Sequence, residues 1–338
     1  MAGLFFSSKL MEKILIVRFS SIGDIVLTSP VVRALHNLNP RPEIHFVTKN
    51  KFTATVDHNP YIDKVYSFEK EITEIAGQLK AENYSLIVDL HSNIRSKRLK
   101  MMLGVKSLRF NKLNYRKWLR VKLKYNRLPD IHIVDRYMKT IESLGGVNDG
   151  KGLDYYISDD DRKIVEQIPE QFKAGFHTLI TGGAHFTKQI PLEILIKIAK
   201  GSQLPLVLLG GPEDTAKAKK ILAAVGDKVW SGCGKLSLNQ SAALIEKSRK
   251  VLAADTGLMH IASAFGKEIL SLWGNTIPEF GMYPYFPEGQ EYKNHIFEVK
   301  GLSCRPCSKI GFDKCPKKHF KCMLDIDLDA VIRELNKE

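Results

Sequence analysis

The stretch KILIVRFSSIGDIVLTSPVVRALHNL, Lys13–Leu38, decides the fold of this chain. It opens with a short apolar and β-branched run, Ile14–Phe19, which is typical of a strand buried on both faces. A loop of small residues ends at Asp24, and apolar residues then recur at helical spacing as far as Leu35. Strand, loop and helix in this order build a site at the carboxyl end of a strand in an open α/β sheet. The loop lacks the G-x-G-x-x-G pattern, so it does not indicate a dinucleotide site.

The same alternation of strands and helices recurs along the chain. Strand-like runs at Tyr84–Leu90, Phe176–Thr181 and Lys250–Ala254 each lead into a short polar or small-residue loop. A length of 338 residues suits two domains. A polar segment rich in Gly and Asp over residues 147–172 separates the two halves. We therefore predict an α/β protein with two domains, residues 1–160 and 161–338.

Positive charge is concentrated in one region of the chain. The net charge is +14, and the 39 residues from His91 to Pro129 contain 13 Lys or Arg and no Asp or Glu. A run of one sign is usually a solvated face, but the complete absence of acids and the interleaved Tyr115 and Trp118 favour an anionic partner. Lipid headgroups or a phosphorylated acceptor suit such a surface. No nucleic-acid-binding motif accompanies the run, so we predict no nucleic acid partner.

Two features predict a cytoplasmic location. No apolar run reaches the roughly 18 residues that a membrane-spanning helix needs. The start of the chain, MAGLFFSSKLMEK, lacks the apolar segment of a signal peptide.

Four positions next to predicted strand ends carry candidate chemistry. Asp24 can act as a general base, or it can be the N-cap of the following helix. Asp255-Thr256-Gly257 lies where a strand turns into a helix, and helix-start amides bind phosphate. Asp255 itself can meet a sugar hydroxyl or cap the helix. Lys188 can add charge to a diphosphate or simply be solvated. Glu213 can accept hydrogen bonds from ribose hydroxyls or stabilise a helix N-terminus.

Three motifs together resemble one enzyme family. They are Arg18–Asp24 (RFSSIGD), Lys188-x-x-Pro191 and Asp255–His260 (DTGLMH), and they resemble glycosyltransferase family 9, the ADP-heptose:lipopolysaccharide heptosyltransferases and close relatives. The resemblance covers about residues 12–335. It implies a GT-B fold, with two Rossmann-like domains facing across a cleft. It also implies an inverting transfer of a sugar from a nucleotide diphosphate that needs no metal or other cofactor.

The resemblance assigns roles to individual residues of this chain. Asp24 matches the catalytic base, and Lys188 matches the lysine that steadies the donor phosphates. Glu213 matches the acid that binds the donor ribose, and Leu236 matches a position near the adenine. Enterobacterial members carry Thr-Thr where this chain has Gly183 and Ala184, and backbone amides can replace those hydroxyls. The donor-binding set is Gly183, Ala184, Glu213, Leu236, Asp255, Thr256, Gly257 and His260.

In such a family the N-terminal domain receives the acceptor and the C-terminal domain binds the donor, here ADP-heptose. The predicted acceptor-binding residues are His91, Asn93, Arg95, Lys97, Arg98, Arg116, Lys117 and Arg120. The basic members of this set would hold the acidic, phosphorylated lipopolysaccharide core at the inner face of the inner membrane, which makes the protein a peripheral one. His91, Ser92 and Asn93 directly follow a predicted strand, so a helix cap by Ser92 or Asn93 is an equal alternative to a binding role. Two other functions remain open: transfer of another activated sugar to a different surface glycan, and non-catalytic binding of polyanions.

Four of the five cysteines lie near the C-terminus. Cys304-x2-Cys307-x7-Cys315-x6-Cys322 offers ligands and a first spacing that suit a structural zinc ion. Reduced packing cysteines and disulfides are the alternatives. Cys233 stands alone and is predicted to be buried. The D-x-D matches within Asp325–Asp329 precede a predicted terminal helix, 330–336, and we interpret them as caps rather than as a metal motif.

Overall fold

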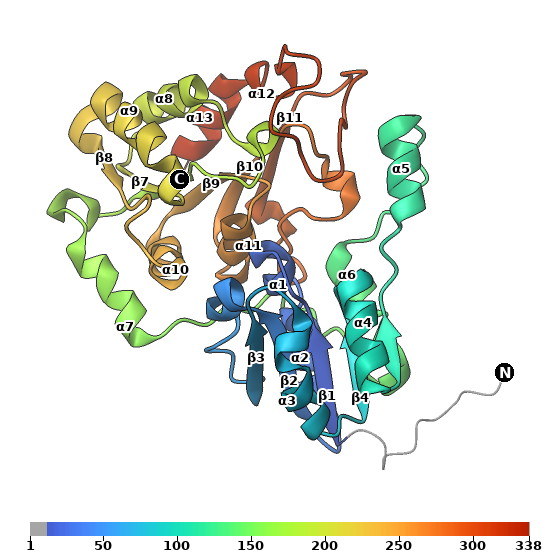
Figure 1. Ribbon diagram of the computed structural model, residues 1–338. Helices are drawn as coiled ribbons and strands as arrows, with labels where there is room; N and C mark the ends of the chain where they lie inside the picture. The colour runs from blue at the N-terminus through green and yellow to red at the C-terminus, as the bar shows by residue number, and fades with distance from the viewer. Residues whose placement is uncertain (1–11, 338) are drawn as a thin grey trace. The chain divides into compact units, whose positions relative to one another are not determined.

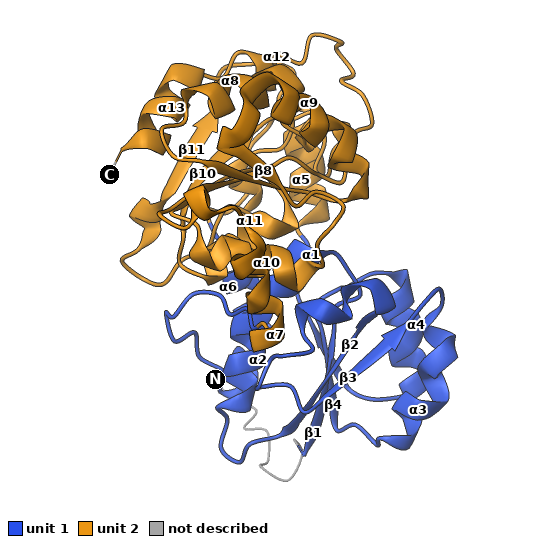
Figure 2. Ribbon diagram, turned by 90° about the vertical axis from the view of Figure 1, so that its left-hand side faces the viewer, with its two compact units in different colours: residues 1–112, 131–156 blue, residues 113–130, 157–338 orange. Residues whose placement is uncertain are grey.

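The computed structural model describes residues 12–337 and contains two parallel sheets, each flanked by helices (Figure 1). The chain forms two compact units (Figure 2). Within the described part, unit 1 comprises residues 12–112 and 131–156, and unit 2 comprises residues 113–130 and 157–337. Residues 113–130, which the sequence analysis grouped with the first domain, therefore make their contacts within unit 2. The first eleven residues, on which the signal-peptide argument rested, lie outside the described range.

The sheet of unit 1 has the strand order β3-β2-β1-β4-β5. Its strands are β1 (Lys13–Val17), β2 (Glu43–Lys49), β3 (Lys64–Phe68), β4 (Leu86–Asp89) and β5 (Ser107–Arg109). Ile14 of β1 pairs with Ile44 on one side and with Leu86 on the other. The side chains of Ile14–Val17 have no exposed surface, which confirms the prediction of a strand buried on both faces.

The helical pattern after β1 forms two helices rather than one. The helices of unit 1 are α1 (Ile22–Val26), α2 (Ser29–His36), α3 (Ala76–Ala81), α4 (Ile94–Leu103) and α6 (Ile133–Met138). Pro30 lies in the first turn of α2. Proline lacks an N–H and its ring obstructs the preceding turn, so it is tolerated there but not inside a continuous helix. The expectation of one uninterrupted helix was therefore wrong, and α1 is a separate short helix that carries Asp24.

The sheet of unit 2 has the order β11-β10-β9-β6-β7-β8. Its strands are β6 (His177–Ile180), β7 (Leu206–Leu209), β8 (Val229–Ser231), β9 (Lys250–Ala254), β10 (Glu268–Trp273) and β11 (Asn294–Glu298). Leu252 of β9 pairs with Leu179 of β6 and with Leu270 of β10, and all three side chains are buried.

Helices cover both faces of this second sheet. The helices of unit 2 are α5 (Asn114–Lys122), α7 (Asp159–Arg162), α8 (Leu192–Gly201), α9 (Thr215–Val225), α10 (Leu238–Lys247), α11 (Gly257–Ala264), α12 (Lys321–Leu324) and α13 (Leu328–Asn336), of which α5 lies apart from the sheet. Asp327 is the N-cap of α13, and its Oδ1 accepts the N–H of Ala330 at 2.9 Å, which confirms the cap interpretation for that residue. Among the described residues, no helix has the length and apolar character required to cross a bilayer.

Candidate functional site

In each sheet the strand order reverses at one point, and the candidate residues follow the two strands on either side of that point. In unit 1 the reversal lies between β1 and β4 (Figure 1), and in unit 2 it lies between β6 and β9. Ligands of open α/β sheets bind outside the carboxyl ends of the strands at such a point. Asp24 and His91 follow β1 and β4, and Lys188 and Asp255 follow β6 and β9. The topology thus places each candidate pair at one edge of its own sheet.

Asp24 occupies the first turn of α1, where it is held by two neighbours. Its Oδ2 accepts the hydroxyl of Ser21 at 2.8 Å and the backbone N–H of Ser21 at 3.3 Å. Its Oδ1 lies 2.5 Å from Nη2 of Arg18. Ser21 is the N-cap of this helix, so the alternative in which Asp24 is the cap was wrong. The Asp24 side chain keeps 23% of its surface exposed, which leaves the carboxylate accessible to a substrate.

Arg18 links the loops that follow β1 and β4. Its guanidinium donates to the carbonyls of Ser20 at 2.8 Å and Leu90 at 2.5 Å, and to the hydroxyl of Tyr137 at 3.1 Å. Burial is the largest effect on the pKa of Arg18 and lowers it, but the charges and hydrogen bonds of Asp24, Tyr137 and Asp89 together leave it above its usual value. The sequence analysis quoted Arg18 only as part of a motif and missed this role. A buried cation therefore fixes the orientation of Asp24.

Asp89, at the end of β4, organises the turn that carries His91. Asp89 is fully buried and accepts the N–H groups of His91 at 3.1 Å and Ser92 at 2.7 Å. It also accepts the hydroxyl of Ser96 at 2.8 Å and pairs with Nζ of Lys100 at 3.0 Å. The sequence analysis included Asp89 in the strand-like run Tyr84–Leu90 but gave it no role.

His91 is held as a neutral imidazole. Its ring packs against Phe19, with the centroids 4.9 Å apart. Burial, followed by the charges of Arg18 and Lys112, lowers the pKa of His91 to about 3. At neutral pH His91 can therefore offer a hydrogen bond to a substrate but no charge.

The other predicted acceptor residues divide between the two units. Asn93 is the N-cap of α4 and accepts the N–H of Ser96 at 2.9 Å, which confirms the cap alternative. The remaining members lie on two helices: Arg95, Lys97 and Arg98 on α4 of unit 1, and Arg116, Lys117 and Arg120 on α5 of unit 2. No described residue of α5 is buried. The predicted basic acceptor residues therefore lie on two separate helices.

In unit 2, Lys188 and Asp255 form an ion pair. Nζ of Lys188 lies 2.6 Å from Oδ2 of Asp255, and the same oxygen accepts the hydroxyl of Thr276 at 3.1 Å. Lys188 ends a single helical turn, Phe186–Lys188, and Asp255 directly follows β9. The sequence analysis had Asp255 meeting a sugar hydroxyl or capping the helix. The cap is instead Thr256, so that alternative was wrong.

Two polar side chains next to this pair lack partners. Within the described part of the chain, the buried hydroxyl of Thr256 and both polar atoms of the buried Asn275 amide make no hydrogen bond. Such a group typically costs about 1–3 kcal/mol when it stays unpaired, and a bound ligand, ion or water would supply the missing partner. Thr256 begins α11, whose N-terminal amides favour an anion, and His260 is buried on the same helix. Asn275 was missed by the sequence analysis, although it lies just beyond the end of β10.

Glycines bring backbone close to side chains at the ends of β6 and β7. A Cβ on Gly182 would lie 2.4 Å from Oδ2 of the buried Asp214, and a Cβ on Gly210 would lie 2.6 Å from it. Asp214 accepts the N–H of Gly211 at 3.0 Å. Glu213 is exposed beside this turn, where it is free to reach a ligand.

The remaining donor positions lie on the loops around this edge. Gln189 donates to the carbonyl of Gly183 at 2.8 Å, whereas Ala184 is exposed. Leu236 packs over Gly232, where a Cβ would lie 2.4 Å from its Cδ1.

All five cysteines are free, so the disulfide alternative was wrong. Cys233 is buried, as predicted. Cys322 is also buried, whereas Cys304, Cys307 and Cys315 are half-buried.

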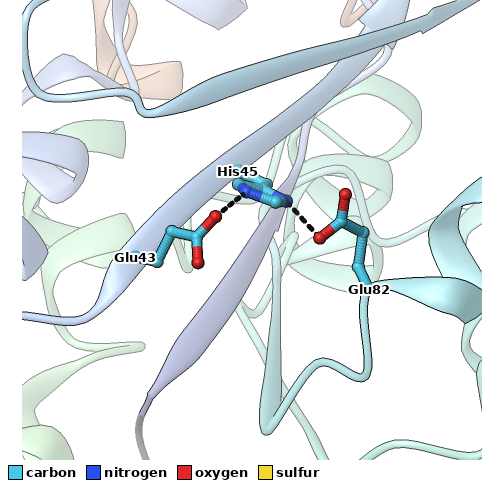
Figure 3. Close-up of side chains that lie close together, drawn as sticks. All are labelled: Glu43, His45 and Glu82. Atoms are coloured by element: carbon cyan, nitrogen blue, oxygen red, sulfur yellow. Dashed lines mark hydrogen bonds and ion pairs between the residues drawn. The ribbon is translucent and has the colours of Figure 1, made fainter.

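A cluster that the sequence analysis missed lies at the opposite edge of the unit 1 sheet. His45, which is fully buried, lies between the carboxylates of Glu43 and Glu82 (Figure 3). Lys13 and Lys64 pair with Glu82 at 2.6 and 2.7 Å. These hydrogen bonds hold the pKa of Glu82 well below its usual range. The lysines neutralise the carboxylates at the amino ends of the strands, so we interpret the cluster as structural.

Comparison with known proteins identifies the family. The family model described as glycosyltransferase family 9 (heptosyltransferase) matches residues 72–310, most of the chain. The chain belongs to glycosyltransferase family 9. It is similar to lipopolysaccharide heptosyltransferase 1 of Campylobacter coli, with 23% identity over 78% of this chain and 84% of the relative. It is also similar to lipopolysaccharide heptosyltransferase 2 of Escherichia coli, with 21% identity over 96% of this chain and 97% of the relative.

The family and the architecture agree. The solved structure of the E. coli ADP-heptose lipopolysaccharide heptosyltransferase II matches with a TM-score of 0.71 and 19% identity, over 96% of this chain and 97% of that one. The fold is GT-B, as the resemblance implied. The protein is a glycosyltransferase of the heptosyltransferase family.

Proposed function

We propose that this family 9 enzyme transfers heptose from ADP-heptose to an anionic lipopolysaccharide core acceptor, with inversion at the anomeric carbon and without a metal ion. The observation that carries the proposal is the Lys188–Asp255 ion pair at the reversal point of the unit 2 sheet, beside the unpartnered hydroxyl of Thr256. The names of the relatives support heptose as the sugar and lipopolysaccharide as the acceptor.

The donor half of the reaction is assigned to unit 2. Lys188 and the N-terminal amides of α11 would neutralise the diphosphate as the bond to the sugar breaks. The hydroxyl of Thr256 would donate to a phosphate oxygen, which supplies its missing partner. Asp255 holds the ammonium group of Lys188 in position. These cationic and dipolar groups take the place of the metal ion used by D-x-D transferases.

The acceptor half is assigned to unit 1. Asp24 would accept the proton of the attacking hydroxyl while that oxygen forms a bond to the anomeric carbon. The electron pair of the old glycosidic bond leaves with the diphosphate, so ADP departs as an anion. Attack from the face opposite the leaving group inverts the anomeric configuration. Arg18 keeps the carboxylate of Asp24 oriented for this step.

The basic helices are assigned to the acceptor. Arg95, Lys97 and Arg98 on α4 and the basic residues of α5 would bind the phosphate groups of the core. The same positive surfaces would hold the enzyme on an anionic membrane as a peripheral protein.

Nucleotide release tests the proposal. Purified enzyme is incubated with ADP-heptose and a lipid A–Kdo acceptor, in the presence and absence of EDTA, with UDP- and GDP-sugars in parallel. We expect acceptor-dependent release of ADP that EDTA does not abolish. Release from only another nucleotide sugar would overturn the donor assignment, and no release from any donor would favour a non-catalytic polyanion-binding protein.

A further inference from the structure

The loop of residues 302–322, here called the cysteine loop, gathers four free thiols in one place. Cys315 packs against the hydrophobic core to which Cys322 belongs. The thiol of Cys307 donates to the carbonyl of Cys304 at 3.0 Å. The thiols of Cys304, Cys307 and Cys315 are near enough to that of Cys322 to interact with it electrostatically. The four thiols therefore lie in one neighbourhood of the fold, although Cys304 and Cys322 are 18 positions apart in the sequence.

The environment of the thiols suits a metal–thiolate centre. Nδ1 of His319 accepts the N–H of Lys321 at 3.0 Å, which leaves the proton of a neutral imidazole on Nε2. That Nε2 lies 3.9 Å from Sγ of Cys304, so His319 is positioned as a donor to the sulfur rather than as a ligand. The cysteine loop carries six Lys or Arg and a single acid, Asp313. These cations would balance the net charge of −2 that four thiolates and one Zn²⁺ have together.

Packing alone does not account for this set. Cysteines retained for packing are among the most buried residues, whereas three of these four are half-exposed among lysines. Among the described residues, no three of the four sulfur atoms of the cysteine loop lie within 4.8 Å of one another. In a tetrahedral zinc site with Zn–S bonds of about 2.3 Å, the sulfurs are roughly 3.8 Å apart. Binding of an ion would therefore contract the loop.

We propose that Cys304, Cys307, Cys315 and Cys322 bind one zinc ion, and that the loop closed in this way is the support that positions Lys188 and Asp255. The metal half of this inference is independent of the proposed function. The positioning half rests on the assignment of a nucleotide donor to unit 2.

Contacts of the cysteine loop fix the turn that carries Lys188. The backbone N–H of Thr187 donates to the carbonyl of Phe312 at 3.1 Å, and the N–H of Phe312 donates to the Thr187 hydroxyl at 2.8 Å. The ring of Phe186 packs against that of Phe320, with the centroids 5.3 Å apart. Both residues that precede Lys188 are thus anchored to the loop between Cys307 and Cys322.

Contacts from the first two cysteines reach the segment that holds Asp255. Arg305, between Cys304 and Cys307, donates to the carbonyls of Gly274 at 2.6 Å and Thr276 at 2.9 Å. The hydroxyl of Thr276 in turn donates to Asp255. Displacement of the loop would therefore disturb both members of the Lys188–Asp255 pair.

The cysteine loop also anchors the basic segment that follows α5. Nζ of Lys124 donates to the carbonyls of Cys304 at 3.1 Å and Pro306 at 2.7 Å. This contact explains how a segment with no buried helix residue belongs to unit 2.

Elemental analysis tests the metal half. The full-length protein is produced in zinc-supplemented medium, purified without chelator and compared with Cys304→Ser, Cys315→Ser and, as the matched control, Cys233→Ala. We expect one zinc per chain in wild type and in C233A, and loss of the zinc in the other two variants. Replacement by Co²⁺ should give the intense absorption of tetrahedral cobalt thiolates. Wild-type protein without zinc, or zinc retained by both serine variants, would overturn the proposal.

Binding of ADP tests the positioning half. Removal of zinc by a chelator should weaken ADP binding by roughly tenfold, the lower end of what loss of supporting contacts costs a site. Re-addition of Zn²⁺ should restore it, while circular dichroism remains unchanged. ADP binding that is unaffected by zinc removal would contradict the positioning role. No ADP binding to the zinc-loaded enzyme would instead contradict the proposed function.

Discussion

The ammonium group of Lys188 lies 2.6 Å from the carboxylate of Asp255, and the two residues follow adjacent strands, β6 and β9, at the point where the sheet of unit 2 reverses its order. A lysine held by a carboxylate keeps a fixed position but retains capacity to donate to an incoming anion. The ion pair brings two separate sequence motifs together in one candidate donor site.

Substitution of Lys188 should therefore remove stabilisation of the leaving group. We expect Lys188→Ala to lower kcat by roughly 10²- to 10³-fold, as the loss of one preorganised charge or donor does in other enzymes. The matched control is Lys197→Ala, because Lys197 is an exposed lysine on α8 of the same unit. Steady-state ADP release measures both variants. A variant K188A with wild-type kcat would refute the role of this lysine.

The hydroxyl of Thr256 should lower the stability of the ligand-free protein and strengthen its binding of ADP. Thr256→Val removes a buried hydroxyl that has no partner within the described residues, so the ligand-free protein should be at least as stable as wild type. The same change should weaken ADP binding several-fold. Thermal unfolding with and without ADP separates the two effects. A lower unfolding temperature without ADP, or unchanged ADP affinity, would contradict this explanation.

Acid should destabilise the fold partly through His177. Burial, followed by the charges of Lys250 and Arg249, lowers the pKa of His177 from 6.5 to about 4. The unfolded chain then binds a proton that the folded one does not, so stability falls as the pH drops from about 6.5 to about 4. His177→Asn keeps an acceptor for the N–H of Lys250 and should flatten this part of the curve. Urea unfolding across this range, with exposed His58→Asn as control, would detect the difference.

The two basic helices should contribute to binding of the acceptor and not to binding of the donor. Combined replacement of Arg95, Lys97 and Arg98 by Ala, and separately of Arg116, Lys117 and Arg120, should raise the acceptor KM and reduce its dependence on salt. The KM for ADP-heptose should change little. The exposed pair Lys219 and Lys220 on α9 provides a control of the same charge type. An acceptor KM unchanged in both triple variants would exclude the proposed role.

The positions of the candidate residues could be predicted from the sequence because they depend on local pattern. Apolar runs such as Ile14–Val17 mark buried strands, and polar residues directly after them lie at the edge where α/β sites form. The break between α1 and α2 was missed because the helical spacing continues across it, although Pro30 is a signal that could have located it.

Contacts between distant segments could not be predicted in the same way. The hydrogen bonds of Arg18 to the loop after β4, and the ion pair of Lys188 with Asp255, depend on which strands are neighbours. The cluster around His45 likewise depends on the register of β1, β2 and β3. Asn275 carries no motif, and only its buried, unpartnered amide within the described structure draws attention to it.

The most direct test of the central claim is the rate of acceptor-dependent ADP release by Asp24→Asn. This variant keeps the size of the side chain but removes the group that would accept the proton. We predict release slowed by roughly 10²- to 10⁴-fold, the usual contribution of a general base, with ADP affinity unchanged because Asp24 lies in unit 1. Release at the wild-type rate would contradict the assignment of Asp24 as the base and, with it, the proposed mechanism.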